Sequence, residues 1–593
     1  MMLVRGTDAT PKMKRVQLVD RWGSDNINGT IHITTSHVVF RADEGVKEIW
    51  IANALIGSVE KSPITAAGVQ ITVKCKHFQT LCFLVSRDNS DIYDSLITCS
   101  RLYNINDAFA FVHKPGENKG NKNWARLDWD KEFERQQLSE AWTLSDFNKD
   151  YEYCDTYPEK LWFPTSATRQ ILIGSAKFRS RARLPVLTYY HKQSNAVICR
   201  CAQPLSGFSA RCVEDETLMD HIRCANPNLG TVFVIDTRPK INAMANKMQG
   251  KGFEDTRYYN NMQLHSFDIE NIHVMRNSEL KLLDACQKQS TPTEFYKAID
   301  SSGWLRHLKA LFDCGKFIAD SITSGISCVV HCSDGWDRTA QTVAIAQILL
   351  DPFYQTINGF ETLIDKDWLG FGFKFDDRCA HITFPNDENS KEVSPIFTQF
   401  IDLVYQIMRQ EPTAFEFNER FLFELNESAY SCIYGTFIGN CDKDRKDLRA
   451  QTRTQSFWVA IDAQLSSYKN PFYKPGSLDL KTIDMPHSVF VPWTSLYNRF
   501  DSGIQPREYF SDIPLTIKEH IEVMEKALES GEEKVALQWQ PLLGCEDCSS
   551  SNCRREISRF ERRPHCYKCG QVYCPRCINI KNSTRICVSC LSK

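Results

Sequence analysis

The sequence HCSDGWDRT at residues 331–339 constrains the fold of this chain more than any other segment. It lies between a mostly apolar run, 326–330, and an apolar stretch, 339–350, which the patterns predict as a buried strand and a helix. A tight loop between a strand and a helix aims backbone N–H groups inward and adds the positive end of the helix dipole. The sequence therefore predicts an anion site at this loop.

The side chains of the loop add reactive groups to that anion site. The same field favours a thiolate, so we expect the pKa of Cys332 to lie below the roughly 8.5 of a free cysteine. Arg338 offers a planar fork of donors that suits two phosphoryl oxygens. Asp334 and Asp337 are the candidate general acids, and Asp337, beside Arg338, is preferred, although capping or solvation is the commoner role for such an aspartate. The expected reaction is phosphoryl transfer to sulfur followed by hydrolysis.

The spacing of cysteine and arginine alone is a weak signal in this chain. The same spacing recurs from Cys548 to Arg554 and from Cys553 to Arg559, inside a cysteine cluster near the C-terminus. Only the Cys332 copy has a strand pattern before it, Gly335 for a tight backbone, and a periodic helix after it.

The loop resembles the signature of the myotubularin-related phosphoinositide 3-phosphatases. Segments 148–158, 236–247 and 271–276 extend the resemblance through most of the chain. It implies that Cys332 is the nucleophile, that Arg338 holds the phosphoryl oxygens, that Asp337 is the acid, and that catalysis needs no cofactor.

The resemblance also implies a set of substrate-binding residues. Those near the 3-phosphate are Ser333, Asp334, Gly335, Trp336, Asn246, Asn271 and Ile272. Two basic residues, Lys374 and Arg378, align with positions that reach toward an additional inositol phosphate. Lys374 stands where an arginine is expected, and Phe373 where a histidine is expected, so we expect looser recognition of a second phosphate.

Four cysteine pairs of the form C-x2-C form a second signal, near the C-terminus. They are Cys545 and Cys548, Cys566 and Cys569, Cys574 and Cys577, and Cys587 and Cys590. Two such pairs close a structural zinc site, so the sequence predicts two zinc ions in preference to disulfides, since no signal peptide is evident. The arrangement resembles a FYVE-type finger, whose interleaved ligation implies that Cys545 and Cys548 share one metal with Cys574 and Cys577. The segments around Trp539 and 562–566 depart from the lipid-binding pattern, which favours protein contact or weak membrane attraction over recognition of phosphatidylinositol 3-phosphate.

Five segments of different character are predicted along the chain. Residues 1–103 alternate like a small β-barrel closed by a helix and resemble a PH-GRAM domain. A polar linker, 104–123, leads into an α/β cysteine-dependent phosphatase domain at 124–507. Residues 508–536 include an apolar helix face, for which packing on the phosphatase domain and a short coiled coil both stay open. The FYVE-like finger occupies 540–593.

Composition limits the partners of the chain. A net charge of −2 over 593 residues argues against nucleic acid as the principal partner. No apolar stretch is long enough to cross a bilayer, so we expect a cytoplasmic protein held peripherally on endosomal or other intracellular membranes. The family resemblance favours a homodimer or a heteromer with a related inactive phosphatase.

Three functions remain in competition at this stage. The first is removal of the 3-phosphate from phosphatidylinositol 3-phosphate and the 3,5-bisphosphate. The alternatives are a protein tyrosine phosphatase and a non-catalytic phosphoinositide-binding scaffold. The presence of both Cys332 and Arg338 favours an active enzyme, and Asp337 within the loop favours the lipid phosphatase.

Overall fold

A computed structural model describes most of the chain, in two compact units, Met1–Trp493 and Thr494–Lys593. The described residues are 12–19, 26–44, 47–86, 91–113, 124–207, 210–259, 261–288, 292–382, 391–500, 521, 539–540, 545, 547–553, 555–557, 564–581 and 584–591. None of the described helices is long and apolar enough to span a bilayer.

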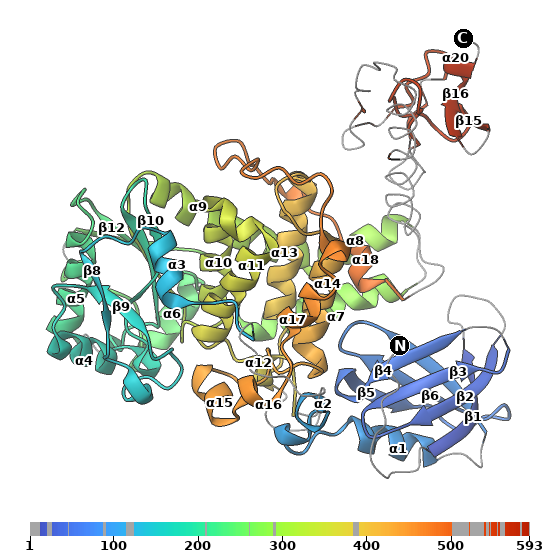
Figure 1. Ribbon diagram of the computed structural model, residues 1–593, viewed down its shortest axis with the longest axis horizontal. Coiled ribbons are helices and arrows are strands. Elements are labelled where there is room, and N and C mark those ends of the chain that lie inside the picture. Colours follow the sequence, from blue (N-terminus) through green and yellow to red (C-terminus); the bar gives the residue numbers. More distant parts are fainter. Residues whose placement is uncertain are drawn as a thin grey trace. The chain divides into compact units, whose positions relative to one another are not determined.

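The N-terminal part of the first unit is a seven-stranded antiparallel sheet followed by a helix (Figure 1). Its strand order is β4-β3-β2-β1-β7-β6-β5. The elements are β1 (Lys12–Val19), β2 (Ile27–Ile33), β3 (His37–Ala42), β4 (Glu48–Ala52), η1 (Asn53–Leu55), β5 (Ile56–Lys61), β6 (Val69–Cys75), β7 (Thr80–Val85) and α1 (Asp91–Ser100). The predicted small β domain closed by a helix is thus confirmed. In β6 every second side chain is buried, as expected for a sheet with one face on a core.

The first part of the predicted linker is not a linker. Residues 105–112 form η3 (Ile105–Asp107) and α2 (Phe109–Val112). Ala108, Ala110 and Phe111 are buried in a cluster with Ile438, and the Ala110 N–H donates to the Cys432 carbonyl at 3.1 Å. These apolar contacts outweigh the polar composition of residues 114–122, which lie outside the described ranges.

A five-stranded sheet forms the centre of the phosphatase part. Its order is β10-β11-β14-β12-β13, with bounds β10 (Val186–His191), β11 (Ala196–Cys201), β12 (Val232–Asp236), β13 (Met262–Ser266) and β14 (Cys328–His331). β14 pairs in parallel with both β11 and β12, and all four of its residues are buried. This central position confirms the buried strand that the apolar run 326–330 predicts.

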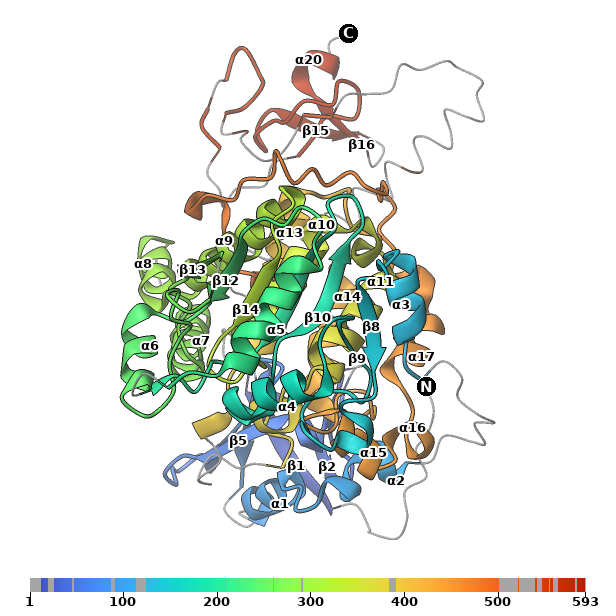
Figure 2. The same ribbon diagram turned by 90° about the vertical axis from the view of Figure 1, so that its left-hand side faces the viewer.

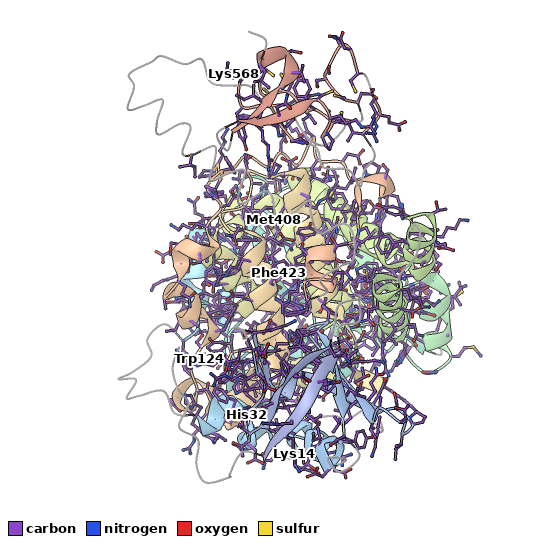
Figure 3. All side chains as sticks on the ribbon, turned by 90° about the vertical axis from the view of Figure 1, so that its right-hand side faces the viewer. Lys14, His32, Trp124, Met408, Phe423 and Lys568 are labelled. Atoms are coloured by element: carbon purple, nitrogen blue, oxygen red, sulfur yellow. The ribbon has the colours of Figure 1, made fainter. Side chains whose placement is uncertain are left out.

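Helices cover both faces of this sheet, which makes the domain α/β as predicted. Figure 2 shows α5 across one face, where it joins the core around Val234 and Val329. α9 and α10 pack on β11 and β14. Apart from short 3-10 helices, the other elements are α3 (Trp129–Arg135), β8 (Trp142–Ser145), β9 (Leu161–Pro164), α4 (Arg169–Phe178), α5 (Val213–Cys224), α6 (Lys240–Lys247), α7 (Ile272–Gln287), α8 (Pro292–Ser302), α9 (Trp304–Thr323), α10 (Arg338–Leu350), α11 (Ile357–Leu363), the π-helix η8 (Ile364–Gly370), α12 (Phe375–Arg378), α13 (Ile396–Gln410), α14 (Glu419–Ser431), α15 (Asp442–Asp447), α16 (Ala450–Arg453) and α17 (Phe457–Asp462). Figure 3 places Phe423 on α14 and Met408 on α13.

The second unit contains α18 (Thr494–Tyr497), the antiparallel pair β15 (Ile578–Lys581) and β16 (Thr584–Cys587), and α20 (Val588–Leu591). The predicted helical segment 508–536 lies outside the described residues except for Ile521, and the predicted domain end at 507 lies outside them too.

Candidate active site

The predicted loop joins the central strand β14 to α10, as the sequence pattern indicates. α10 is buried from Arg338 to Leu349, so the helix that follows the loop runs through the core. The Asp337 side chain makes no capping hydrogen bond to this helix, which leaves its carboxylate for other partners.

Cys332 lies at the base of the loop with 3 % of its surface exposed. Burial acts to raise the pKa of its thiol, but the Arg338 charge and the hydroxyl and N–H of Thr339 more than offset this, so the pKa is lowered. The Gly335 N–H also lies 3.2 Å from Sγ and donates to it. These contacts favour the thiolate, which is the nucleophilic form of cysteine.

Arg338 is held against the loop by two donated hydrogen bonds. Nη1 donates to the Ile269 carbonyl at 3.1 Å, and Nη2 donates to Ser333 Oγ at 3.4 Å. The guanidinium therefore lies beside the nucleophile, where it can pair with an anion.

Gly335 adopts a left-handed backbone with φ of +79°. A Cβ at this position would lie 2.3 Å from the Cys201 carbonyl oxygen, closer than any side-chain carbon can approach. Both conditions require glycine, so Gly335 sets the shape of the loop.

Asp337 forms a bidentate ion pair with Arg378. Nε of Arg378 lies 2.9 Å from one carboxylate oxygen and Nη2 lies 3.0 Å from the other. Arg378 also pairs with Glu392 at 3.0 Å, and Asp337 raises the pKa of Arg378 further against the opposing effect of burial. The residue predicted to reach a second phosphate is therefore engaged with the predicted acid.

Lys374 lies against the Trp336 side chain of the loop. Its Nζ lies 4.9 Å from the centre of the Trp336 ring and 3.1 Å from a carboxylate oxygen of Asp377. Its side chain is 29 % exposed. Lys374 thus lies beside the loop with its charge partly in solvent.

The other predicted substrate residues are linked to the loop through intermediates. Nδ2 of Asn246 donates to Gln203 Oε1 at 3.3 Å, and the Gln203 N–H donates to the Ser333 carbonyl at 3.1 Å. Asp334 accepts a hydrogen bond from Ser180 Oγ at 2.8 Å, which holds the shape of the loop.

Asn271 is the N-cap of α7. Its Oδ1 accepts hydrogen bonds from the N–H groups of His273 and Val274 at 3.0 and 3.1 Å. The Ile272 carbonyl accepts from Ser394 Oγ at 2.8 Å. Both residues stand close in sequence to Ile269, whose carbonyl holds Arg338, so the start of α7 lies beside the loop.

A buried acidic contact below the loop was not evident from the sequence. Glu254 Oε2 lies 3.1 Å from His331 Nε2, and Oε1 lies 2.5 Å from Nη1 of Arg179. Burial lowers the pKa of His331, but Glu254 more than offsets this effect and the pKa is raised. His331 is thereby fixed directly before the nucleophile.

Two arginines that contact Gly335 were also missed. Arg183 and Arg200 are both fully buried and donate to the Gly335 carbonyl. The available signal was weak: Arg200 is the one charged residue in the apolar strand run 196–201.

The cysteine cluster near the C-terminus forms two groups of four sulfurs, but one group differs from the prediction. One holds Cys566, Cys569, Cys587 and Cys590, as predicted, and the other holds Cys548, Cys553, Cys574 and Cys577, each group with its Sγ atoms within 4.8 Å of one another. The placement of Cys545 in the first predicted site is wrong, because Cys545 is in neither group of four sulfurs and Cys553 takes its place. Four sulfurs at such distances can hold a metal ion.

The sheet is mostly parallel, and a cysteine directly follows its central strand. Together with the loop shaped by Gly335 and the arginine that opens the next helix, this arrangement defines a cysteine-dependent phosphatase. Comparison with known families agrees with this class: residues 108–446 match the Myotubularin-like phosphatase domain, and residues 12–100 match the GRAM domain of MTMR6-9. The chain belongs to the myotubularin-like phosphatases.

Three relatives are similar over most of their length. A Caenorhabditis elegans protein named phosphatidylinositol-3,5-bisphosphate 3-phosphatase MTMR6 is 47 % identical, with 98 % of each chain covered. The Homo sapiens phosphatidylinositol-3-phosphate phosphatase MTMR7 is 44 % identical over 87 % of this chain and 80 % of its own. The Homo sapiens phosphatidylinositol-3,5-bisphosphate 3-phosphatase MTMR8 is 44 % identical over 90 % of this chain and 76 % of its own.

Proposed function

We propose that this protein removes the 3-phosphate from phosphatidylinositol 3-phosphate and from phosphatidylinositol 3,5-bisphosphate. The observation that carries the proposal is the loop itself, in which a cysteine with a lowered pKa lies beside Arg338 and next to donated N–H groups. The names of the relatives supply the substrate class, because both lipids occur among their activities.

The proposed reaction has two phosphoryl transfers. The Cys332 thiolate attacks phosphorus, the S–P bond forms, and the bond to the 3-oxygen of the inositol breaks while Asp337 donates a proton to that oxygen. Water then attacks phosphorus with Asp337 as the base, and the S–P bond breaks to release phosphate. Arg338 neutralises charge on the phosphoryl oxygens in both steps.

Helix α6 supports a membrane surface as the place of reaction. Ile241, Met244 and Met248 are 81 %, 61 % and 82 % exposed, an unusual apolar stripe at helical spacing. Lys240 and Lys247 at the two ends of α6 are exposed, and each adds about 1 kcal/mol of attraction near an anionic leaflet. Asn246 on the same helix links through Gln203 to the loop, so α6 lies beside the candidate site.

Two structural zinc ions are proposed for the two cysteine groups. Four thiolates with no histidine or carboxylate among them suit tetrahedral zinc and leave no open position for catalysis. We further propose a cytoplasmic protein on endosomal or other intracellular membranes. Dimerisation, or a complex with a related inactive phosphatase, stays a prediction, since the apolar helix face predicted within 508–536 falls outside the described residues except for Ile521.

A phosphate-release panel over all singly and doubly phosphorylated phosphoinositides tests the proposal, with Cys332→Ser as the blank. We expect release only from lipids that carry a 3-phosphate. Release from phosphotyrosine peptides without release from the 3-phosphorylated lipids would establish the tyrosine phosphatase instead, and binding without release from any substrate would establish the scaffold.

A further inference from the structure

Two buried arginines converge on one backbone oxygen of the loop. Nη2 of Arg183 and Nη2 of Arg200 each lie 3.0 Å from the Gly335 carbonyl oxygen. Both side chains are 0 % exposed, and they come from different parts of the fold, Arg183 from the segment before β10 and Arg200 from β11. Two charged donors therefore occupy both lone pairs of a single neutral carbonyl oxygen.

The geometry of the peptide bond converts this contact into an orientation of the loop. The Gly335 carbonyl and the Trp336 N–H belong to one planar trans peptide, so they point in opposite directions. Holding the carbonyl against the arginines therefore turns the Trp336 N–H to the other side of the peptide, away from them. The Gly335 N–H already points at Cys332 Sγ, at 3.2 Å. Successive N–H groups aimed one way form an anion-binding concavity.

The two arginines differ in how their charge is balanced. Arg200 has a buried partner, Asp367, at 2.9 Å. Among the described residues, Arg183 has no carboxylate within ion-pair distance. Its Nη1 donates to the Thr156 carbonyl and hydroxyl and its Nη2 also donates to the Phe371 carbonyl, while its buried Nε has no hydrogen-bond partner among the described residues. The guanidinium lies 4.2 Å from the centre of the Tyr157 ring.

A fully buried cation without a counter-ion is costly, because neutral dipoles replace its hydration only in part. Arg183 is separated from the sulfur of Cys332 by one residue of the loop, Gly335, which contacts both. An anion that enters the loop supplies the missing negative charge. Anion binding at the loop, and not packing of the core, therefore explains why the charge of Arg183 is buried.

We propose that Arg183 and Arg200 are positioning residues of the loop, which orient the Gly335–Trp336 peptide for anion binding, and that the uncompensated charge of Arg183 strengthens that site. Neither arginine touches the transferred group; both act through Gly335. The inference rests on the proposed use of the loop as the phosphate site.

The test uses the full-length protein and two readouts that involve no lipid. The first is the pH at which alkylation of Cys332 by iodoacetamide is half-maximal, followed by mass spectrometry of the peptide. The second is the affinity for orthovanadate, an analogue of the transferred phosphate. The variants are Arg183→Met, which removes the charge, and Arg183→Lys, which keeps the charge and removes the fork. Arg445→Met is a matched control, because Arg445 is also buried and donates to the Gly439 carbonyl without contacting the loop.

We expect Arg183→Met to raise the half-maximal pH by about one unit and to weaken vanadate binding by about tenfold, the loss typical of one charge-assisted contact. Arg183→Lys should keep the half-maximal pH and weaken vanadate severalfold, and Arg445→Met should change neither readout. A folded Arg183→Met protein with both readouts as in the unaltered protein overturns the inference. If that variant does not fold, unchanged vanadate affinity in Arg183→Lys overturns it. Neither readout uses a lipid, so both would be unaffected if the proposed lipid phosphatase activity were wrong. The experiment can therefore refute the positioning role and the proposed function independently.

Discussion

Replacing Gly335 with alanine is the sharpest test of how the loop geometry supports turnover. Alanine at φ of +79° costs about 1 to 2 kcal/mol in backbone strain. Its Cβ would lie 2.3 Å from the Cys201 carbonyl oxygen, whereas ordinary contact begins at 3.4 Å, so the loop must move by about 1 Å relative to β11. The obstacle is the backbone of β11, which cannot rotate away as a side chain could.

A displacement of this size matters more for turnover than for folding. Misplacing reacting groups by about 1 Å lowers rates by roughly 100-fold, which corresponds to about 2.7 kcal/mol of transition-state stabilisation. We therefore expect Gly335→Ala to lose about 100-fold in kcat on phosphatidylinositol 3-phosphate, with a fall in unfolding free energy of about 1 to 3 kcal/mol. Phosphate release gives the first quantity and chemical denaturation gives the second.

Gly325→Ala separates the two effects. Gly325 also has a left-handed backbone, with φ of +83°, but it precedes β14 and its Cβ would meet only the side chain of Asn228 at 3.0 Å. It should lose similar stability and keep its kcat. If Gly335→Ala retains a kcat within about threefold of the unaltered protein while folded, the link from loop geometry to catalysis is refuted.

Three further predictions concern the acid, the metal groups and the membrane helix. Asp337→Asn should slow release from the lipid, a poor leaving group, about 100-fold more than release from an activated aryl phosphate; equal slowing would remove Asp337 as the acid. Cys553→Ser should lower the zinc content measured by elemental analysis from about two ions per chain to about one. Cys545→Ser should leave the zinc content unchanged. The reverse result would show that Cys545, as the sequence predicts, and not Cys553, is the metal ligand. Met248→Gln should weaken sedimentation with anionic vesicles severalfold, about 1 kcal/mol, while Val213→Gln, at a position 64 % exposed on α5, should not; equal binding by both variants would exclude α6 from the membrane contact.

The strand, loop and helix at the centre of the phosphatase part can be predicted from the sequence, because the residue patterns that indicate them are local. The apolar run before residue 331 is buried on both faces as β14, and the periodic stretch after residue 338 becomes α10. Gly335 was singled out for a tight backbone, and its left-handed φ confirms the reason. Each of these short segments contains the residue pattern that determines its own conformation. Apolar periodicity and the position of the glycine are therefore sufficient to predict it.

The parts that sequence patterns missed depend on distant segments. A C-x2-C pair indicates two neighbouring thiols, but the sulfur that completes a group of four is chosen by how the remaining chain returns, and here Cys553 replaces Cys545. Arg378 was expected to reach toward a second phosphate. Its Nε instead lies 2.9 Å from a carboxylate oxygen of Asp337, which is 41 residues away in sequence. Arg183 gave no signal at all, because its role depends on Gly335, 152 residues further along the chain. Long cationic side chains have several low-energy positions, and only the folded surroundings decide which oxygen each one meets. The electrostatics of such a loop therefore have to be obtained from the assembled fold, whereas its nucleophile can be identified from nine consecutive residues.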